Sequence, residues 1–243
     1  MLSRVKSAQK LGSPIPTSAL VMFSALMLGE TTINWIDRQA LSVLAPTLRD
    51  EFGWSNAQYA QIVNAFMITY LFAYSFAGWV LDRIGIRRGL TLSIVWWSTA
   101  GVLTSLSTGL KSMSFFRALL AVGEGGAWPS FAKAAAVWIP EKARSMFIGV
   151  CNSGSSLGIM IATALVAFIK IRWGWRWAFV VTGLLGFGWV IMFRLFMWRH
   201  PEFSEADASQ VAKGPRRSWL ELVGYRQAWA DRKSTRLNSS HER

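Results

Sequence analysis

Few residues of this chain could form disulfides, bind metals or act as catalytic bases. The 243 residues include one cysteine, Cys151, and two histidines, His200 and His241. A single cysteine excludes an intrachain disulfide and a cysteine-based metal site. Charged residues make up only 16% of the sequence, whereas 52% are hydrophobic and the mean hydropathy is +0.30. This composition is too apolar for an ordinary soluble domain of this size and indicates a membrane protein.

The formal net charge of +13 does not indicate a nucleic-acid-binding protein. Lysines and arginines lie between the apolar runs and form no basic stripe with interleaved aromatic residues. We therefore predict that the chain binds no nucleic acid, no cofactor and no metal, and that its main surroundings are a lipid bilayer.

Six apolar stretches are each long enough to cross a membrane as a helix. A bilayer core about 30 Å thick requires about 20 helical residues. We therefore predict an all-α membrane protein with six transmembrane helices. The stretches cover approximately residues 17–46, 56–81, 89–110, 113–138, 145–169 and 176–198.

The same pattern predicts four consecutive parts of the chain. Residues 1–16 are a cytoplasmic N-terminal segment and residues 17–199 form the six-helix domain. Residues 200–230 are polar at first, and we predict a cytoplasmic linker that leads into a missing seventh helix. Residues 231–243, which begin "DRKSTRLNSSH", resemble a translated sequencing-library adapter. We interpret them as an artefact and expect the native sequence shown to break off after Ala230.

The distribution of basic residues predicts an inner-membrane protein with a cytoplasmic N-terminus. Basic residues concentrate on the cytoplasmic side of a membrane protein. With the N-terminus inside, the outer side carries Arg49, Lys111, Lys170 and Arg172. The inner side then carries Arg4, Lys6, Lys10, Arg83, Arg87, Arg88, Lys142, Arg144, Arg199, Lys213, Arg216 and Arg217.

The loop after the second stretch reads "GWVLDRIGIRRG", residues 78–89. A small residue favours close helix contact, an acid can cap or pair with a neighbouring helix end, and arginines hold the loop at the inner surface. Any basic loop would be sufficient to set the membrane topology. The pattern also resembles the signature loop of the major facilitator superfamily of secondary transporters. The residues that match it are Gly78, Asp82, Arg83, Gly85, Arg87 and Arg88.

Three further segments sharpen this resemblance. They read "INWIDRQALSVLAP", "FRALLAVGEGGAWPSFAKAAAVWIPEKAR" and "NSGSSLGIMIA", and together they resemble the anion:cation symporter branch, especially its hexuronate and aldonate transporters. The resemblance implies two six-helix halves, each made of two inverted three-helix repeats, with the substrate bound between the halves. Residues 17–230 resemble the N-terminal half and the linker, so a C-terminal half is an expected partner.

Polar residues interrupt the first predicted helix at regular intervals. Glu30, Asn34 and Asp37 are spaced i, i+4 and i+7, and Arg38 is adjacent, so these side chains share one helical face. A charge that faces lipid costs about 2.5–3.5 kcal/mol. We therefore expect this face to border a polar cavity. Glu30 departs from the family pattern, which leaves an extra proton site and a local substitution with an unseen partner as alternatives.

The resemblance implies roles for four of the membrane-depth residues. Asp37 and Glu124 match positions that carry the coupling protons, and Arg38 matches the position that receives the substrate carboxylate. Because burial disfavours a carboxylate and a nearby arginine favours it, anion binding at Arg38 is expected to change the proton affinity of Glu124. Arg117 is expected to attract anions. The alternatives are mutual neutralisation, with Arg38 bridging Asp37 or Glu124, and an Arg117 that snorkels to the surface.

Two other predicted helices offer polar side chains to the same cavity. Tyr70 matches a cavity tyrosine of the family; alternatively it belongs to an aromatic row spaced four residues apart along its helix. Asn152, Ser155 and Ser156 share a face at i, i+3 and i+4. They are expected either to bind substrate hydroxyl groups or to hydrogen-bond neighbouring helices.

These residues together predict a proton-coupled symporter of sugar-acid anions, with another organic or inorganic anion as the alternative substrate. A six-helix intramembrane serine protease would need a buried serine, as in "NSGSSLG", and a histidine on another helix. His200 lies at the inner end of the sixth predicted helix, before Pro201, and His241 lies in the adapter-like tail. A channel would need a filter-like loop between spans, which the sequence does not contain. We therefore predict a transporter and not an enzyme.

Overall fold

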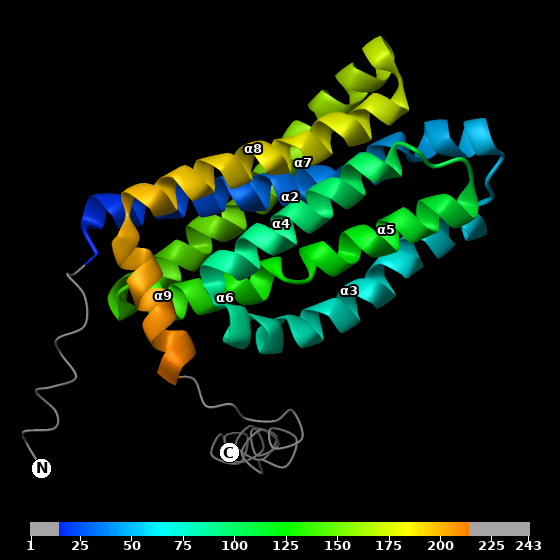
Figure 1. Ribbon diagram of the computed structural model, residues 1–243. Coiled ribbons are helices and arrows are strands. Elements are labelled where there is room, and N and C mark those ends of the chain that lie inside the picture. The colour runs from blue at the N-terminus through cyan, green and yellow to red at the C-terminus, as the bar shows by residue number, and fades with distance from the viewer. Residues whose placement is uncertain (1–14, 214–243) are drawn as a thin grey trace, which may run out of the picture. The chain divides into compact units, whose positions relative to one another are not determined.

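The computed structural model describes residues 15–213, and all regular secondary structure within that range is helical. The predicted lead-in to a seventh helix and the adapter-like tail lie outside the described residues. Figure 1 shows the helices in order. They are α2 (Thr17–Phe52), α3 (Asn56–Ile84), α4 (Ile86–Thr104), α5 (Leu110–Glu124), α6 (Ala127–Trp138), α7 (Arg144–Trp173), α8 (Trp175–Arg199) and α9 (Pro201–Lys213), with a short 3-10 turn at Glu141–Ala143.

Five predicted spans correspond to single helices, but the fourth is divided. Residues 113–138 form α5 and α6, which are separated at Gly125 and Gly126. Pro129 lacks an N–H group for the carbonyl oxygen of Gly125, and this loss interrupts the helical hydrogen bonds at that point. Within residues 15–213, four helices are long and apolar enough to cross a membrane by length and composition, namely α2, α3, α7 and α8. Six spanning helices therefore remain a prediction.

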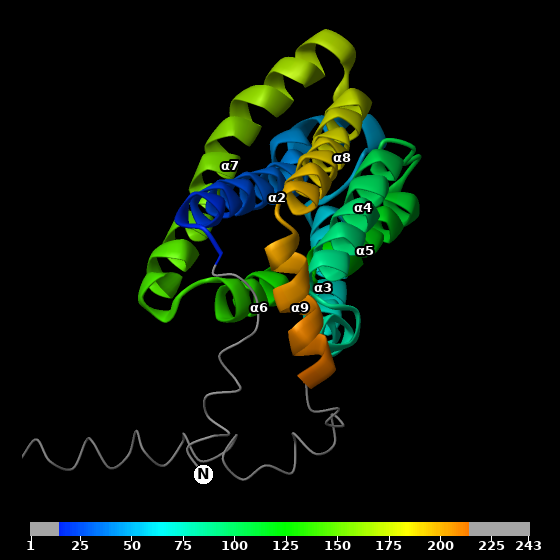
Figure 2. The ribbon, with the colours of Figure 1, turned by 60° about the vertical axis from the view of Figure 1, so that its left-hand side comes forward.

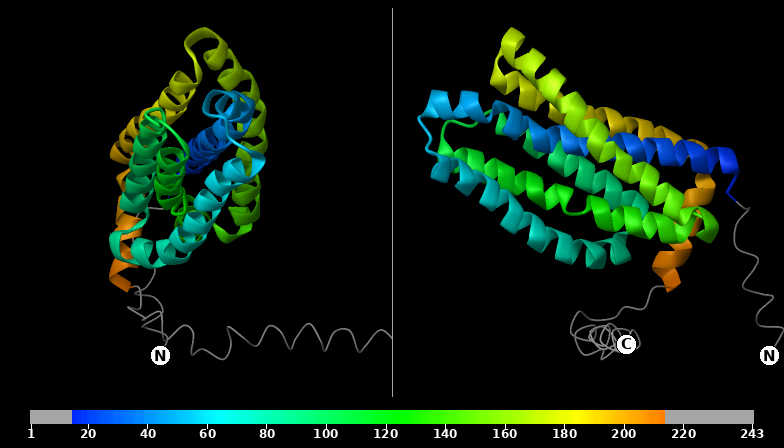
Figure 3. Two further views of the ribbon diagram at one scale, coloured as in Figure 1. Left: turned by 90° about the vertical axis from the view of Figure 1, so that its right-hand side faces the viewer. Right: turned by 180° about the vertical axis from the view of Figure 1, so that it is seen from behind.

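The helices associate in pairs that are distant in sequence. Helix α2 packs along α7, α3 along α5, and α4 along both α5 and α8. Figure 2 shows α2, α7 and α8 together and α3, α4 and α5 beside them, and Figure 3 gives the end-on and rear views. The first helix thereby lies against both α7 and α8, which places its polar face inside the bundle.

Two glycines of α7 permit its close approach to α2. Gly154 and Gly158 lie one turn apart, and both are buried. A Cβ atom at Gly154 would lie 2.8 Å from the carbonyl oxygen of Leu28, and one at Gly158 would lie 2.6 Å from that of Thr32. This is the small-xxx-small spacing that brings membrane helices into backbone contact. The "NSGSSLG" segment therefore holds the bundle together as well as carrying polar residues.

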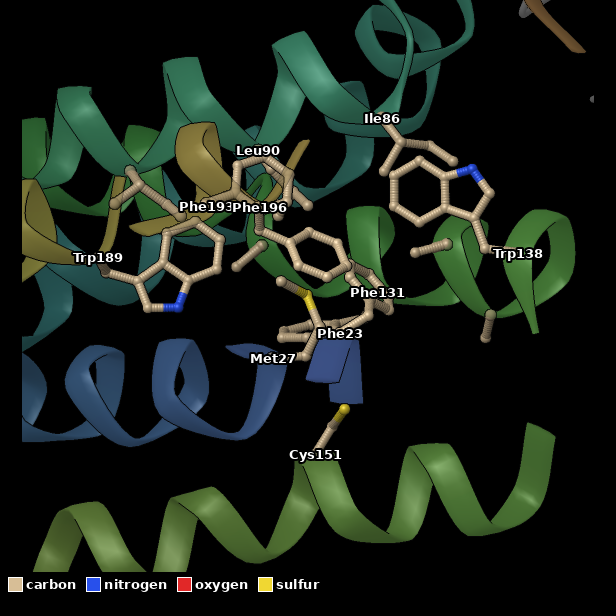
Figure 4. Packing of buried hydrophobic residues seen from close by; sticks show 14 of the residues in the cluster. Phe23, Met27, Ile86, Leu90, Phe131, Trp138, Cys151, Trp189, Phe193 and Phe196 are labelled. Carbon is tan, nitrogen blue, oxygen red and sulfur yellow. The ribbon is translucent and has the colours of Figure 1, made fainter. Parts of the chain in front are cut away.

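An apolar core fills the space between α2, α4, α6 and α8 (Figure 4). Phe23 of α2 lies at its centre, with its ring centroid 5.1 Å from that of Trp138 and 5.7 Å from that of Phe147. Cys151 is buried against the same core. The thiol therefore serves as a packing group of this core.

The first part of the segment predicted as a linker is helical. Residues 201–213 form helix α9, which begins with a proline, a residue well suited to the first helical position. Phe203 is completely buried, and its ring lies 5.4 Å from Phe23 and 5.3 Å from Trp138, centroid to centroid. The segment is polar on average, but its one aromatic side chain enters the core and holds the helix there.

Asp207 ties α9 to the loop between α3 and α4. Its carboxylate accepts hydrogen bonds from the backbone N–H groups of Ile86 (2.9 Å) and Arg87 (3.1 Å). These are orphan donors at the start of α4, where a negative charge is also favoured by the helix dipole. Gly85 has φ +82°, and a Cβ atom there would lie 2.7 Å from Asp207. Glycine at this position thus permits both the turn and the cap.

We expect Gly158→Ala to destabilise the protein by about 1–3 kcal/mol, because the added methyl group overpacks the contact with the Thr32 carbonyl. Thermal unfolding of the purified protein in detergent measures the change. Gly149→Ala is the matched control on α7, since a Cβ atom there meets nothing within 4 Å. A Gly158→Ala variant that melts at or above the wild-type temperature would contradict the close helix contact.

We expect Asp207→Ala to loosen the start of α4 at a cost of about 0.5–2 kcal/mol, the usual value of a helix cap. Hydrogen exchange of the Ile86 and Arg87 amides should become faster in this variant. Glu205→Ala changes an exposed acid of the same helix and should leave both amides protected. Equal exchange in the two variants would show that Asp207 does not cap α4.

Candidate functional site: a polar cavity beside a buried ion pair

Five helices contribute to a cavity of about 240 Å³ beside the polar face of α2. Most of its polar residues come from α2 and α7, and aromatic residues close the rest. The lining consists of Glu30, Thr31, Asn34, Trp35 and Arg38 of α2, Tyr70 of α3, Glu124 of α5, Trp128 and Phe131 of α6 with Ala127, and Asn152 and Ser155 of α7.

Arg38 and Glu124 form an ion pair across this cavity. The Nε atom of Arg38 donates to Oε2 of Glu124 at 2.5 Å. The Glu124 side chain is fully buried, whereas that of Arg38 is 22% exposed. The pair uses only the Nε group, which leaves the two terminal nitrogens of the guanidinium for a second carboxylate. Neutralisation by Arg38 and substrate binding at Arg38 are therefore compatible with one geometry.

Aromatic rings hold the Arg38 guanidinium in place. Its central carbon lies 4.5 Å from the ring centroid of Tyr70, 5.4 Å from that of Phe66 and 5.5 Å from that of Trp35. The Tyr70 ring also stacks on Phe66 and lies tilted against Tyr74, with centroid distances of 5.9 and 6.1 Å. The tyrosine thus belongs to the aromatic row and also lines the cavity, and its role in substrate binding remains a prediction.

Arg117 does not snorkel to the surface. It is only 4% exposed, and its guanidinium donates to the backbone carbonyl oxygens of Asp37 (3.4 Å) and Arg38 (3.5 Å). It lines a second cavity, which shares Arg38 with the first and is bordered by Tyr59 and Gln39. Arg38 therefore lies between two cavities, with Glu124 in one and Arg117 in the other.

Asp37 lies apart from both cavities. It is 2% exposed, and neither carboxylate oxygen accepts a hydrogen bond from the residues that the structure describes. Thr182 of α8 faces it, but the Thr182 hydroxyl donates to the carbonyl oxygen of Phe179 at 3.4 Å. Gly101 of α4 lies on the same side. The structure thus places Asp37 between helices, and its role as a proton site remains a prediction.

The polar residues of α7 divide into two groups. Asn152 and Ser155 line the cavity, and Ser155 donates to the carbonyl oxygen of Asn152 at 2.7 Å. Ser156 is exposed and does not line it. On α2, Asn34 faces Glu124, and its amide nitrogen has no hydrogen-bond partner within residues 15–213. Asn34, Asn152 and Ser155 are therefore the polar side chains that the structure brings to the ion pair's cavity.

The predicted signature loop makes specific contacts at one end of the bundle. Lys133 of α6 donates to the carbonyl oxygen of Leu81 (2.7 Å) and to the Asp82 carboxylate (3.0 Å). The expected pairing of Asp82 with a neighbouring helix is therefore present. Gly78, by contrast, permits no close contact here, because a Cβ atom would meet nothing within 4 Å.

The arginines of the loop differ in their surroundings. Arg83 stacks on Trp79 at 3.5 Å from the ring centroid, and Arg87 donates to the hydroxyl of Ser204 at 3.1 Å. Arg88 is exposed. Arg87 thus connects the loop to α9, a contact that the sequence analysis missed because it treated α9 as a linker.

Sequence reasoning also missed Trp35, which lines both cavities and contacts Arg38. Its position three residues before Arg38 places it on the same helical face, so the spacing was a usable signal. The helix break after Glu124 had a signal as well, in the glycine pair followed by Pro129.

Comparison with curated proteins finds anion transporters. The chain is 31% identical over 194 residues to the probable sulfoacetate transporter of Cupriavidus necator, covering 80% of this chain and 43% of that protein. It is 32% identical over 180 residues to the hexuronate transporter of Escherichia coli K12, covering 74% of this chain and 41% of the relative. The chain thus spans less than half the length of each of these two relatives.

Comparison with solved structures shows the same fold. A bacterial homologue of the human lysosomal transporter Spinster, in its inward-facing unoccupied conformation, superposes with a TM-score of 0.67 at 21% identity over 74% of this chain and 43% of that chain. The model of the Major Facilitator Superfamily matches residues 28–237, most of the sequence. This chain is therefore a member of the major facilitator superfamily of membrane transporters.

Proposed function

We propose that the chain is the N-terminal half of a proton-coupled symporter that carries sugar-acid anions of the hexuronate or aldonate type across the inner membrane by alternating access. The observation that carries this proposal is the Arg38–Glu124 ion pair at the wall of a polar cavity. The hexuronate relative supports the substrate class, and the sulfoacetate relative makes another small organic anion the alternative.

The ion pair supplies a physical basis for coupling. When Glu124 is a carboxylate it neutralises Arg38, and an arriving anion would leave an uncompensated negative charge in a buried site. When Glu124 is protonated, the guanidinium is free for the substrate carboxylate. A proton on Glu124 and an anion on Arg38 therefore favour one another, and by linkage each raises the affinity of the other.

The remaining predicted roles extend this scheme. Arg117, in the second cavity, attracts the anion toward Arg38, and the unpartnered Asp37 carboxyl is a second proton site. Asn34, Tyr70, Asn152 and Ser155 bind the uncharged part of the substrate. We further propose the inverted three-helix repeats, a cytoplasmic N-terminus and a second six-helix half that closes the cavity.

A protease function finds no support in the described residues. The Ser155 hydroxyl is bonded to a backbone carbonyl, and no histidine lines the cavity. His200, at the end of α8, contacts Glu202 at 3.0 Å.

We expect Glu124→Gln to abolish proton-driven accumulation of a sugar acid while exchange of bound for free substrate partly persists. A neutral amide cannot release and rebind the proton, but it leaves Arg38 open to anions. The assay is uptake of labelled glucuronate into proteoliposomes under an imposed pH gradient, with the gene read from genomic DNA beyond residue 230. Glu141→Gln, on an exposed acid, is the matched control. Full accumulation of the sugar acid by Glu124→Gln would show that Glu124 does not couple transport to protons. Uptake that requires sodium would show that sodium, and not the proton, is the coupling ion.

We expect Arg38→Lys to weaken binding of glucuronate about 10-fold or more, because an ammonium group cannot hold Glu124 and a substrate carboxylate in a fixed planar fork. Loss of a hydrogen bond to a charged group typically costs about 1.5–3 kcal/mol. Equilibrium binding to the purified protein measures the change. Arg172→Lys, at the end of α7, should bind like the wild type. Wild-type affinity in Arg38→Lys would place the anion site elsewhere.

A further inference from the structure

Glu30 is a buried acid that the proposed coupling scheme does not use. It is 1% exposed and lines the same cavity as Arg38 and Glu124. Its Oε2 atom accepts a hydrogen bond from the Thr31 hydroxyl at 3.4 Å. Its Oε1 atom is buried without a hydrogen-bond partner in the described part of the chain. A buried oxygen without a hydrogen bond lowers the stability of the folded protein. We therefore expect a molecule that enters the cavity to supply a hydrogen-bond partner for this atom.

The charges buried on and beside the polar face of α2 do not balance when every acid is ionised. Within residues 15–213, this region contains three buried carboxyl groups, those of Glu30, Asp37 and Glu124, and two guanidinium groups, those of Arg38 and Arg117. The empty cluster is neutral only if one acid carries a proton. With a bound monoanion it is neutral only if two acids do. At least one acid therefore carries a proton in both states.

Of the two acids that line the cavity, Glu30 is the one without a cation beside it. Glu124 is bonded directly to Arg38, and the Arg117 guanidinium lies at the backbone of Asp37. The groups that face Glu30 are the Thr31 hydroxyl on its own helix, the thiol of Cys151 on α7, and the charges of Glu124 and Arg38 in the cavity. No cation contacts it within residues 15–213. A protonated carboxyl group is the form that such surroundings stabilise.

A protonated acid here has a hydrogen-bond donor and an acceptor to offer. Arg38 is eight residues along α2 from Glu30, about 12 Å of helix rise, so the two side chains enter the cavity from separate turns. Asn152 and Ser155 join Glu30 in the lining, on the part of α7 where Gly154 meets Leu28 and Thr31. Uncharged polar groups thus gather near Glu30, and the cationic group lies further along α2.

We propose that Glu30 stays a neutral carboxylic acid through the transport cycle and hydrogen-bonds a hydroxyl group of the substrate, so that it selects hydroxylated acids over their deoxy analogues. This inference rests on the proposed function. It makes Glu30 a specificity residue and not a third coupling site, and it gives the orphan Oε1 atom its partner.

Two substitutions of Glu30 separate charge from hydrogen bonding. Glu30→Gln keeps a donor, an acceptor and zero charge, so glucuronate affinity should stay within about 3-fold and the proton-to-substrate ratio should not change. Glu30→Leu removes both hydrogen-bonding functions, and glucuronate should bind about 10-fold or more weakly, as for a binding site that loses one buried hydrogen bond. Wild type and both variants are compared as full-length protein in proteoliposomes and by equilibrium binding.

Monodeoxy analogues of glucuronate identify the contact. One of these analogues lacks the hydroxyl group that faces Glu30, and the wild type should bind it about 10-fold or more weakly than glucuronate. Glu30→Leu should bind this analogue and glucuronate with equal affinity. Retained binding of that analogue shows that the leucine variant is folded.

Three results would overturn the proposal, and they differ in meaning. A changed proton-to-substrate ratio in Glu30→Gln would make Glu30 an ionising coupling group. If Glu30→Leu loses the same factor of affinity for glucuronate and for every analogue, the role of Glu30 is structural. The proposed function itself would be wrong if the wild type neither binds nor transports hydroxylated acids and if Glu124→Gln behaves like the wild type in both assays.

Discussion

The ion pair between Arg38 and Glu124 is the constraint on which the rest of this structure depends. A charge buried in a membrane bundle without a partner is costly, and removing one member of a buried pair costs more than the pair contributes. The Arg38 side chain is therefore held by an acid at Nε and by the rings of Trp35, Phe66 and Tyr70, and 22% of it stays exposed. The terminal guanidinium nitrogens remain for an anion. Because Glu124 neutralises Arg38 while the terminal nitrogens stay accessible, the guanidinium can exchange the Glu124 carboxylate for that of a substrate.

The backbone is arranged around that pair. Helix α5 ends at Glu124, and the break at Gly125 and Gly126 redirects the chain into α6, whose residues then close the cavity. A Cβ atom at Gly125 would lie 2.7 Å from that of Ala73, so the break also lets α5 approach α3. On the opposite side, Gly154 and Gly158 bring α7 against α2. Small residues thus set the width of the cavity, and polar residues set its chemistry.

The sequence predicted the helical class, the approximate position of most helices and the charged residues of the site, because charges at membrane depth have few structural explanations. It did not predict which acid pairs with Arg38, since helical spacing fixes a face and not the neighbour across it. Asp37, adjacent in sequence, proved to lie away from the cavity, whereas Glu124 reaches it. Helix α9 was missed because average polarity hides one aromatic residue and one capping acid, Phe203 and Asp207, that act through particular contacts.

The exposed polar face of α7 indicates what must cover the cavity. Asn152, Ser153 and Ser156 are exposed on a helix that is otherwise apolar enough to span a membrane. The Ser153 hydroxyl donates to the carbonyl oxygen of Val150, but the Asn152 amide and the Ser156 hydroxyl remain poorly suited to contact with hydrocarbon. Lipid would therefore be an unfavourable neighbour for this face. A second helical bundle with an aqueous cavity between the two would satisfy it, and such a bundle is what the proposed C-terminal half supplies.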